Sequence, residues 1–194
     1  MSVLLIGGSP SERSRSAALL DSVSQRLLLR GATIERLHIR DLSPQSLLLA
    51  DTAHRTIAAA IDQVARAKAV VVATPVYKAA YSGVLKVFLD LLPQTALKNK
   101  TVLPLATGGS PNHMLALDYA LRPVLQSLSA RHILPGVYAT DSQVTLLPEG
   151  GHHMGAEISS RLDEAVATLF SEVHRMPATS GFEPIAFSRV RCSV

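Results

Sequence analysis

The sequence predicts a single α/β domain, built on a doubly wound, five-stranded parallel sheet of strand order 2-1-3-4-5 with helices on both faces. Three observations lead to this prediction. Apolar runs of strand length alternate with segments of helical periodicity along the whole chain. Residues 69–73 are all apolar, which is typical of a strand buried on both faces. Loops whose residues are suited to ligand binding follow the first, third and fourth of these strands, and such loops meet at one edge of an open α/β sheet.

The composition sets the broad class of the protein. The chain has 194 residues, of which 47% are hydrophobic and 18% charged, as in a globular domain with a sizeable core. No run is long and apolar enough to suggest a membrane span, and the first residues fit a strand better than a signal peptide. The net charge of +4 suits an anionic nucleotide, but no basic run suggests a nucleic-acid binder. The single cysteine, Cys192, excludes a disulfide framework and fits a cytoplasmic protein.

The first strand, residues 3–6, runs into a loop of glycine, serine and arginine before a helical stripe that ends near Gly31. A helix start offers unpaired N–H groups and a partial positive charge, so an anion can bind there. The loop matches neither the dinucleotide fingerprint nor the lysine-bearing nucleotide loop, which points to a mononucleotide phosphate. The candidate ligands are Ser9, Ser14, Ser16 and either Arg13 or Arg15. The alternative is that the serines only cap the helix.

Residues 32–39 alternate sufficiently to predict the second strand. Residues 41–52 read as a loop with one short turn, and residues 56–67 as an amphipathic helix. Asp62 and Arg66 stand four residues apart on the outer side of that helix, where they can form a weak ion pair.

The third strand ends at Thr74-Pro75, because proline cannot donate to a sheet ladder. A helical stripe of Val84, Leu85, Phe88, Leu89 and Leu92 begins after Ser82. The loop between strand and helix carries two tyrosines and two lysines, Tyr77, Tyr81, Lys78 and Lys86. Flat apolar rings beside positive charge suit a flat aromatic ligand that carries a phosphate, although an ordinary surface loop is the alternative.

Residues 101–107 predict the fourth strand, in which Pro104 is awkward for a central position. The glycine-rich loop that follows, residues 108–113, allows the backbone to approach a flat ligand closely. The next predicted helix, residues 112–130, contains Pro123, which cannot bond to the carbonyl of Tyr119. We therefore expect either a kink or a π-bulge at Tyr119.

The rest of the chain predicts a fifth strand at 132–138, a loop at 141–151 and a last helix at 157–174. The domain then covers residues 1–176, followed by a C-terminal tail at 177–194. His152 and His153 lie near Glu149, but adjacent histidines rarely face one ion together, so we expect no metal site.

Several of these segments together resemble a known family. They are Gly8-Ser9-Pro10, Ser14-Arg15-Ser16, the run from Ala73 to Gly83, and the run from Leu103 to Gly109. They are similar to the flavodoxin-like NADPH-dependent FMN reductases, and most similar to the reductase components of two-component alkanesulfonate monooxygenase systems. The resemblance covers about residues 3–145, and it includes the stretch before Pro123, since an inserted tyrosine at this helix is associated with a π-helix in that group. Ser11 departs from the wider family, in which an arginine is common at this place; we favour Arg15 over Arg13 for the phosphate.

The resemblance implies that NADPH reduces FMN by hydride transfer, and that the reduced flavin leaves for a partner flavin-dependent monooxygenase that releases sulfite from organosulfonates. The two nucleotides supply the chemistry, so we expect no general acid or base. The resemblance implies that the phosphate is bound by Ser9, Ser14, Arg15 and Ser16. It implies that the flavin lies along Pro75, Val76, Tyr77 and Lys78 on one side and Thr107, Gly108 and Gly109 on the other. It also places Ser110 and His113 near the nicotinamide. Tyr119 is expected at a subunit contact of a homodimer or homotetramer. The apolar face at Leu85, Phe88, Leu89 and Leu92 is compatible with such a contact, although packing in the core explains it equally well.

Two other readings use the same fold. A quinone or azo-compound reductase would hold FMN tightly and would purify yellow. A flavodoxin-like electron carrier is usually acidic and small, whereas this chain is basic and longer. No residue in the sequence separates NADPH from NADH as the hydride donor.

Overall fold

A parallel sheet of order β2-β1-β3-β5-β6 forms the centre of the molecule, with β7 continuing the edge position of β6 beside β5. The structure is a computed structural model, and it describes residues 1–175. The strands are β1 (Ser2–Gly7), β2 (Thr33–His38), β3 (Ala69–Tyr77), β5 (Thr101–Gly108), β6 (His132–Ile133) and β7 (Val137–Thr140). This order confirms the predicted 2-1-3-4-5 sheet. The expected tail at 177–194 lies outside the described residues.

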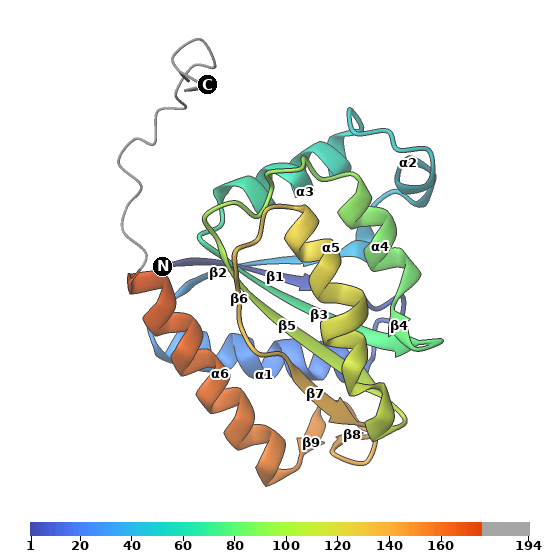
Figure 1. The fold of residues 1–194 in the computed structure, drawn as a ribbon. Helices are drawn as coiled ribbons and strands as arrows, with labels where there is room; N and C mark the ends of the chain where they lie inside the picture. The colour runs from blue at the N-terminus through green and yellow to red at the C-terminus, as the bar shows by residue number, and fades with distance from the viewer. Residues whose placement is uncertain (176–194) are drawn as a thin grey trace, which may run out of the picture.

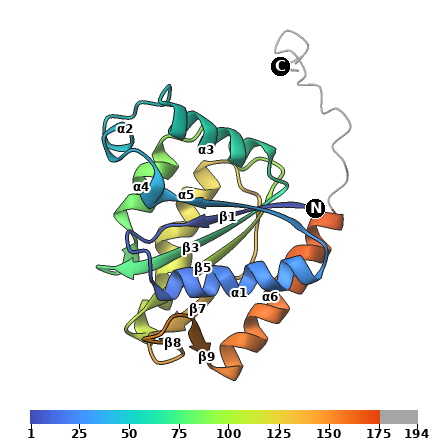
Figure 2. The same ribbon diagram turned by 180° about the vertical axis from the view of Figure 1, so that it is seen from behind.

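Helices cover both faces of the sheet, as Figures 1 and 2 show. On one face lie α1 (Arg15–Leu29) and α6 (Ala156–Arg175); on the other lie α3 (Arg55–Arg66), α4 (Gly83–Asp90) and α5 (Arg122–Ser127). Successive strand residues point to opposite faces, so Leu4 and Ile6 of β1 join the core under α3, α4 and α5, while Val3 and Leu5 join the core under α1 and α6. The two-sided burial explains why β1, β3 and β5 are continuously apolar.

Pro104 occupies the middle of the central strand β5, where every residue is buried. It is tolerated because the neighbouring strand is interrupted beside it, between β6 and β7. A Cβ on Gly136, in that interruption, would lie 3.2 Å from the Pro104 carbonyl oxygen and 3.4 Å from its Cγ. The backbone therefore passes close to Pro104 without needing a ladder hydrogen bond from it. The expectation of one continuous strand over 132–138 was wrong for this reason.

The helix expected over 112–130 is divided into three segments of different winding. A 3₁₀ segment, η2 (Pro111–Leu115), is followed by a π-helix, η3 (Ala116–Leu121), and then by α5. Tyr119 lies in the π-helix and Pro123 at the start of α5, so the structure confirms the π alternative over a plain kink. A proline that cannot donate to the preceding turn favours this wider winding.

Several short strands and helical turns outside this helix were not predicted from the sequence. The predicted loop at 141–151 contains β8 (Val144–Leu146), which forms an antiparallel hairpin with β9 (His152–Met154) directly after that loop. The short turn expected within 41–52 is confirmed as α2 (Pro44–Leu48). Two other elements were not predicted: η1 (Ile39–Asp41) follows β2, and β4 (Ala80–Tyr81) pairs with the end of β3. The Asp62–Arg66 ion pair on α3 is confirmed.

The apolar face of α4 belongs to the core. Leu85, Phe88, Leu89 and Leu92 are all buried against the sheet, which confirms core packing, one of the two interpretations left open, over a contact between subunits. Over residues 1–175, the structure contains no helix with the length and hydrophobicity that a membrane span requires.

Candidate functional site

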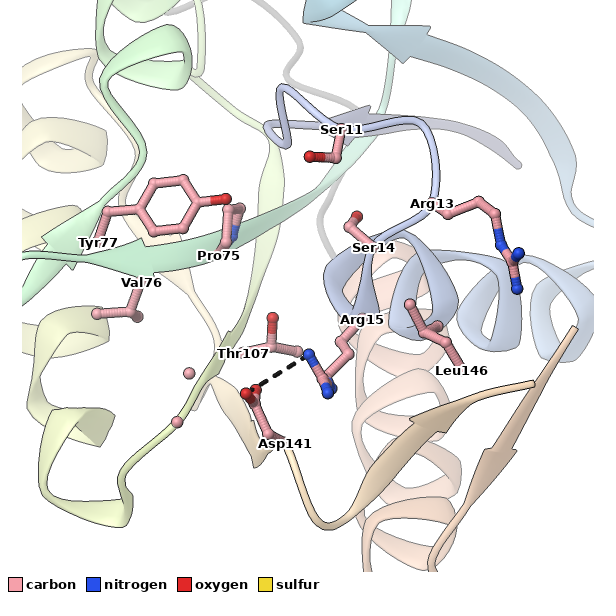
Figure 3. Close-up of a pocket in the computed structure, with 12 residues that line it drawn as sticks. Ser11, Arg13, Ser14, Arg15, Pro75, Val76, Tyr77, Thr107, Asp141 and Leu146 are labelled. Carbon is pink, nitrogen blue, oxygen red and sulfur yellow. Dashed lines mark ion pairs between the residues drawn. The ribbon is translucent and has the colours of Figure 1, made fainter. Parts of the chain in front are cut away.

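A pocket of about 270 Å³ lies at the carboxyl edge of the sheet, where the loops after β1, β3, β5 and β7 meet (Figure 3). Its lining residues are Ser11, Arg13, Ser14, Arg15, Pro75, Val76, Tyr77, Thr107, Gly108, Gly109, Asp141 and Leu146. Three of the four loops are the ones that the sequence singled out. Parallel strands bring their carboxyl ends to one edge, which explains why segments far apart in sequence form one pocket.

The first wall is the start of α1. Ser14 is the N-cap, and its hydroxyl accepts a hydrogen bond from the N–H of Ala17 at 3.2 Å. Ser9 and Ser16 are buried and do not line the pocket: the Ser9 hydroxyl accepts from the N–H of Ser11, and the Ser16 hydroxyl lies 3.2 Å from that of Ser14. Of the predicted serines, Ser14 alone is among the lining residues; the other two shape the loop behind it.

The two candidate arginines point in different directions (Figure 3). Arg15 extends across the pocket floor, where its Nε donates to the Val144 carbonyl at 3.0 Å and its Nη1 lies 3.4 Å from Oδ2 of Asp141. Arg13 directs its guanidinium away, toward the carbonyl oxygens of Leu147 and Pro148. The guanidinium available to a ligand in this pocket is therefore that of Arg15.

The second wall is the hairpin formed by the end of β3 and β4. Val76 pairs with Tyr81, and Tyr77 pairs with Ala80, so Lys78 and Ala79 make a two-residue turn. Both turn residues have positive φ, 51° and 63°, as a type I′ turn requires. The Tyr77 ring is half exposed at the pocket margin, whereas Lys78 lies outside the lining residues.

A hydrogen-bond chain joins the first two walls. The Ser82 hydroxyl, which caps α4, donates to the carbonyl of Gly8, and the Ser82 N–H donates to the hydroxyl of Thr74 at 3.0 Å. A Cβ on Gly8 would lie 3.0 Å from the Leu85 Cβ. Glycine is therefore needed for the close approach of the first loop to α4.

The third wall is the end of β5. A Cβ on Gly108 would lie only 2.5 Å from the hydroxyl oxygen of Tyr138, and that hydroxyl donates to the Ser110 carbonyl at 2.6 Å. Burial, and to a smaller degree the charge of Asp141, raises the pKa of Tyr138, so the hydroxyl keeps its proton and its role as donor. Ser110 caps η2 through its own hydroxyl, and neither it nor His113 lines the pocket.

Sequence analysis missed Asp141 and Leu146 as lining residues. Asp141 directly follows β7, and its position after a strand of the sheet was a signal that could have identified it. Leu146 reaches the pocket through the β8–β9 hairpin, which was read as a loop. In the same hairpin, the His152 Nε2 lies 3.1 Å from the Ser22 hydroxyl. Residues 1–175 contain no cluster of three potential metal-ligating side chains.

The lining residues of the pocket offer groups that can bind an anion at one end and a flat ring at the other. A helix N-terminus, a hydroxyl and a guanidinium form one end, which suits an anion. Pro75, Val76 and Tyr77 line the other end beside the neighbouring segment 107–109, since Pro75 pairs with Thr107 in the sheet, and together they offer a surface that suits a flat ring. The lining residues include no histidine, cysteine or lysine.

Comparison with known proteins agrees with this geometry. Residues 1–145 match the family described as NADPH-dependent FMN reductase. The chain is 44% identical to the FMN reductase (NADPH) of Escherichia coli (strain K12), over 90% of this chain and 91% of that protein. It is 31% identical to the NADH-dependent FMN reductase SfnE of Pseudomonas putida, over 91% of this chain and 96% of that protein. The crystal structure of an apo NADH:FMN oxidoreductase superposes with a TM-score of 0.82 at 39% identity, covering 92% of both chains.

Proposed function

This chain belongs to the NADPH-dependent FMN reductase family and is an NAD(P)H-dependent FMN reductase, and from that premise we propose that it treats FMN as a substrate that it releases after reduction. NADPH is the proposed hydride donor. The proposed recipient of the reduced FMN is a flavin-dependent monooxygenase of the alkanesulfonate type. This assignment rests on the resemblance of the three loops to those of alkanesulfonate monooxygenase reductases. The count of one cysteine, Cys192, supports work in the reducing cytoplasm.

The residues of the pocket fit a flavin mononucleotide. Ser14, Arg15 and the start of α1 would hold the phosphate, with Ser9 and Ser16 fixing the shape of that loop. A Cβ on Gly109 would have no protein atom nearer than 3.9 Å, so a side chain there would take up pocket space that the glycine leaves open. When bound, the flavin accepts a hydride from the nicotinamide and so supplies the redox chemistry.

The flavin ring would lie between the two remaining walls. Pro75, Val76 and Tyr77 would line one side and Thr107, Gly108 and Gly109 the other. The backbone of these segments would fix the ring and present N–H groups to its polar edge. Outside the lining, Lys78 would reach the exposed edge of the ring, and Ser110 and His113 would lie near the nicotinamide.

The observation that carries the release proposal is the limited size of the pocket. Its volume of about 270 Å³ is below the ~300–1,000 Å³ of typical small-molecule sites. We infer from this volume that one chain encloses only part of an FMN molecule and leaves the rest open to exchange. Weak binding with a Kd in the micromolar range, or about 8 kcal/mol, is expected.

We further propose that the protein forms a homodimer or homotetramer, with Tyr119 at a subunit contact near a neighbour's flavin. Tyr119 is 79% exposed on the π-helix, next to the exposed apolar side chains of Met114 and Leu115 on η2. The three large apolar side chains are exposed together on one short segment, which favours a contact with another copy of this chain. Size-exclusion chromatography with light scattering tests this directly: a monomer at assay concentration would contradict it.

The function is tested with the purified wild-type protein. Its visible spectrum is recorded, and the oxidation of NADPH and of NADH in air is then followed with and without added FMN, against a reaction without enzyme. A colourless protein whose activity depends on added FMN supports the proposal. A yellow protein that oxidises the coenzyme without added FMN, and turns over rapidly only with a quinone or azo dye, would instead be a reductase that retains its flavin.

A further inference from the structure

We propose that Asp141 competes with the phosphate of the flavin nucleotide for Arg15 and thereby keeps the affinity for FMN low. This inference rests on the proposed function, because it assigns the anionic end of the pocket to the FMN phosphate. It makes Asp141 an affinity-setting residue of the site.

The motivating feature is a carboxylate within a pocket built for an anion. Asp141 lines the pocket, and its Oδ2 lies 3.4 Å from Nη1 of Arg15, as the dashed line in Figure 3 marks. The side chains of the arginine and the aspartate are 39% and 48% exposed, so water and ligands reach the pair. A phosphate that approaches Arg15 meets a second negative charge already paired with the same guanidinium.

The geometry favours competition over positioning. The guanidinium of Arg15 is already anchored by a neutral partner, because its Nε donates to the Val144 carbonyl at 3.0 Å. The contact with Asp141 is longer than the ~2.7–2.9 Å of a directed, charge-assisted hydrogen bond, so it acts mainly through charge. Among residues 1–175, no partner is found for Nη2 of Arg15, which leaves one donor edge for a ligand.

A carboxylate at this place has a definite effect on binding. The FMN phosphate must either share the Arg15 guanidinium with Asp141 or displace the Asp141 carboxylate from it. In both cases the net attraction between Arg15 and the phosphate, and so the affinity for FMN, is reduced. Asp141 Oδ2 also borders the glycine segment, 3.9 Å from the position of a Cβ on Gly109, but the oxidised flavin ring is neutral, so the charge of Asp141 acts mainly on the anionic phosphate. Weakening through the phosphate suits an enzyme that gives up its flavin after each turnover.

The test is the substitution Asp141→Asn, which keeps the size of the side chain and removes its charge. Binding of oxidised FMN, and of riboflavin, which lacks the phosphate, is measured by isothermal titration calorimetry in the absence of NADPH. Because exposed ion pairs are weak, we expect a Kd for FMN about two- to fivefold lower than that of the wild type. The Kd for riboflavin is expected to stay the same.

Two further variants make the result specific. Asp163→Asn removes the same charge from a second Arg–Asp pair, Arg26–Asp163 (2.7 Å between Nε and Oδ1), which links α1 to α6 away from the pocket; it should leave the Kd for FMN unchanged. In an Arg15→Ala background, where FMN binds more weakly, Asp141→Asn should lose most of its tightening effect, because the contested guanidinium is gone.

Unchanged or weaker FMN binding by Asp141→Asn overturns the proposal, the latter because it would make Asp141 a positioning residue. Equal tightening of FMN and riboflavin also overturns it, because the carboxylate would then act on the ring. Failure of the proposed function is distinguishable, since it shows in the wild-type spectrum and FMN dependence, whereas this inference fails only in ratios between variants.

Discussion

Replacement of Gly108 by alanine tests how the third wall of the pocket is held. The added Cβ would lie 2.5 Å from the Tyr138 hydroxyl oxygen and 3.3 Å from the Val76 Cβ. No side chain tolerates the shorter contact, so the Tyr138 ring must move. When it moves, it loses the 2.6 Å hydrogen bond to the Ser110 carbonyl, which anchors the loop after β5.

The size of the effect follows from these two contacts. Overpacking of this kind costs ~1–3 kcal/mol, and the lost hydrogen bond about 1 kcal/mol. Gly108→Ala should therefore lower the free energy of unfolding by about 2–4 kcal/mol. Tyr138→Phe alone should cost about 1 kcal/mol, through the hydrogen bond. In the double variant the oxygen that clashes is absent, so the two losses should overlap by about 1–2 kcal/mol.

Urea unfolding followed by far-ultraviolet circular dichroism measures all three variants, with calorimetric FMN affinity as a second readout. Gly109→Ala is the matched control, since its Cβ would meet no atom nearer than 3.9 Å: it should cost little stability yet weaken FMN binding by entering the pocket. If the losses from Gly108→Ala and Tyr138→Phe simply add, the contact does not hold the loop and the reasoning is refuted.

Three further predictions follow from other features of the fold. Ala79 has a φ of 63°, which costs an L-residue ~1–2 kcal/mol, so Ala79→Gly should raise the midpoint of urea unfolding. The control Ala80→Gly, in β4, should lower that midpoint. A lower midpoint for both variants would contradict the turn assignment. Burial, and then the charge of a neighbouring arginine, lower the pKa of His38 below 6.5. The folded state therefore binds this proton less readily than the unfolded chain does. The free energy of unfolding that is present above pH 6.5 should decline as the pH falls toward the folded-state pKa. His38→Gln should reduce the loss of unfolding free energy between about pH 7.5 and 5, and an unchanged loss would show that other groups cause it. Finally, if the π-helix loosens the flavin site, Tyr119→Ala should purify yellow with bound FMN and release it slowly, and a colourless variant with unchanged turnover would refute that role.

Much of the site was accessible from sequence because the relevant signals are local. A charge-free strand such as β3 is recognisable without knowledge of its neighbours, although the end predicted at Thr74-Pro75 was wrong: the strand runs on to Tyr77, because Pro75 stays in register with Thr107 and the last two residues pair with β4. The rule that parallel strands end at one edge then brings Ser14, Tyr77 and Gly109 together. The signal for a helix irregularity at Tyr119 was equally local, since Pro123 removes a hydrogen bond to Tyr119 within one turn, but it did not distinguish a kink from a π-helix.

The remaining features depend on contacts between distant segments. Ser9 and Ser16 have the same chemistry as Ser14, and only the path of the folded loop turns them away from the pocket. The stripe on α4 has the same period whether it faces the sheet or another subunit, and packing placed it in the core.

The sequence by itself thus determined the order of the sheet strands, the position of the ligand loops and the place of a helix irregularity at Tyr119, whereas the structure decided that this irregularity is a π-helix. The tertiary structure alone decided that Arg15 meets Asp141, that Arg13 turns to another loop, and that a broken edge strand accommodates Pro104. The physical reason is range. Periodicity and backbone restrictions act within a turn or a strand, whereas side-chain pairing depends on segments that the sheet brings together from more than a hundred residues apart.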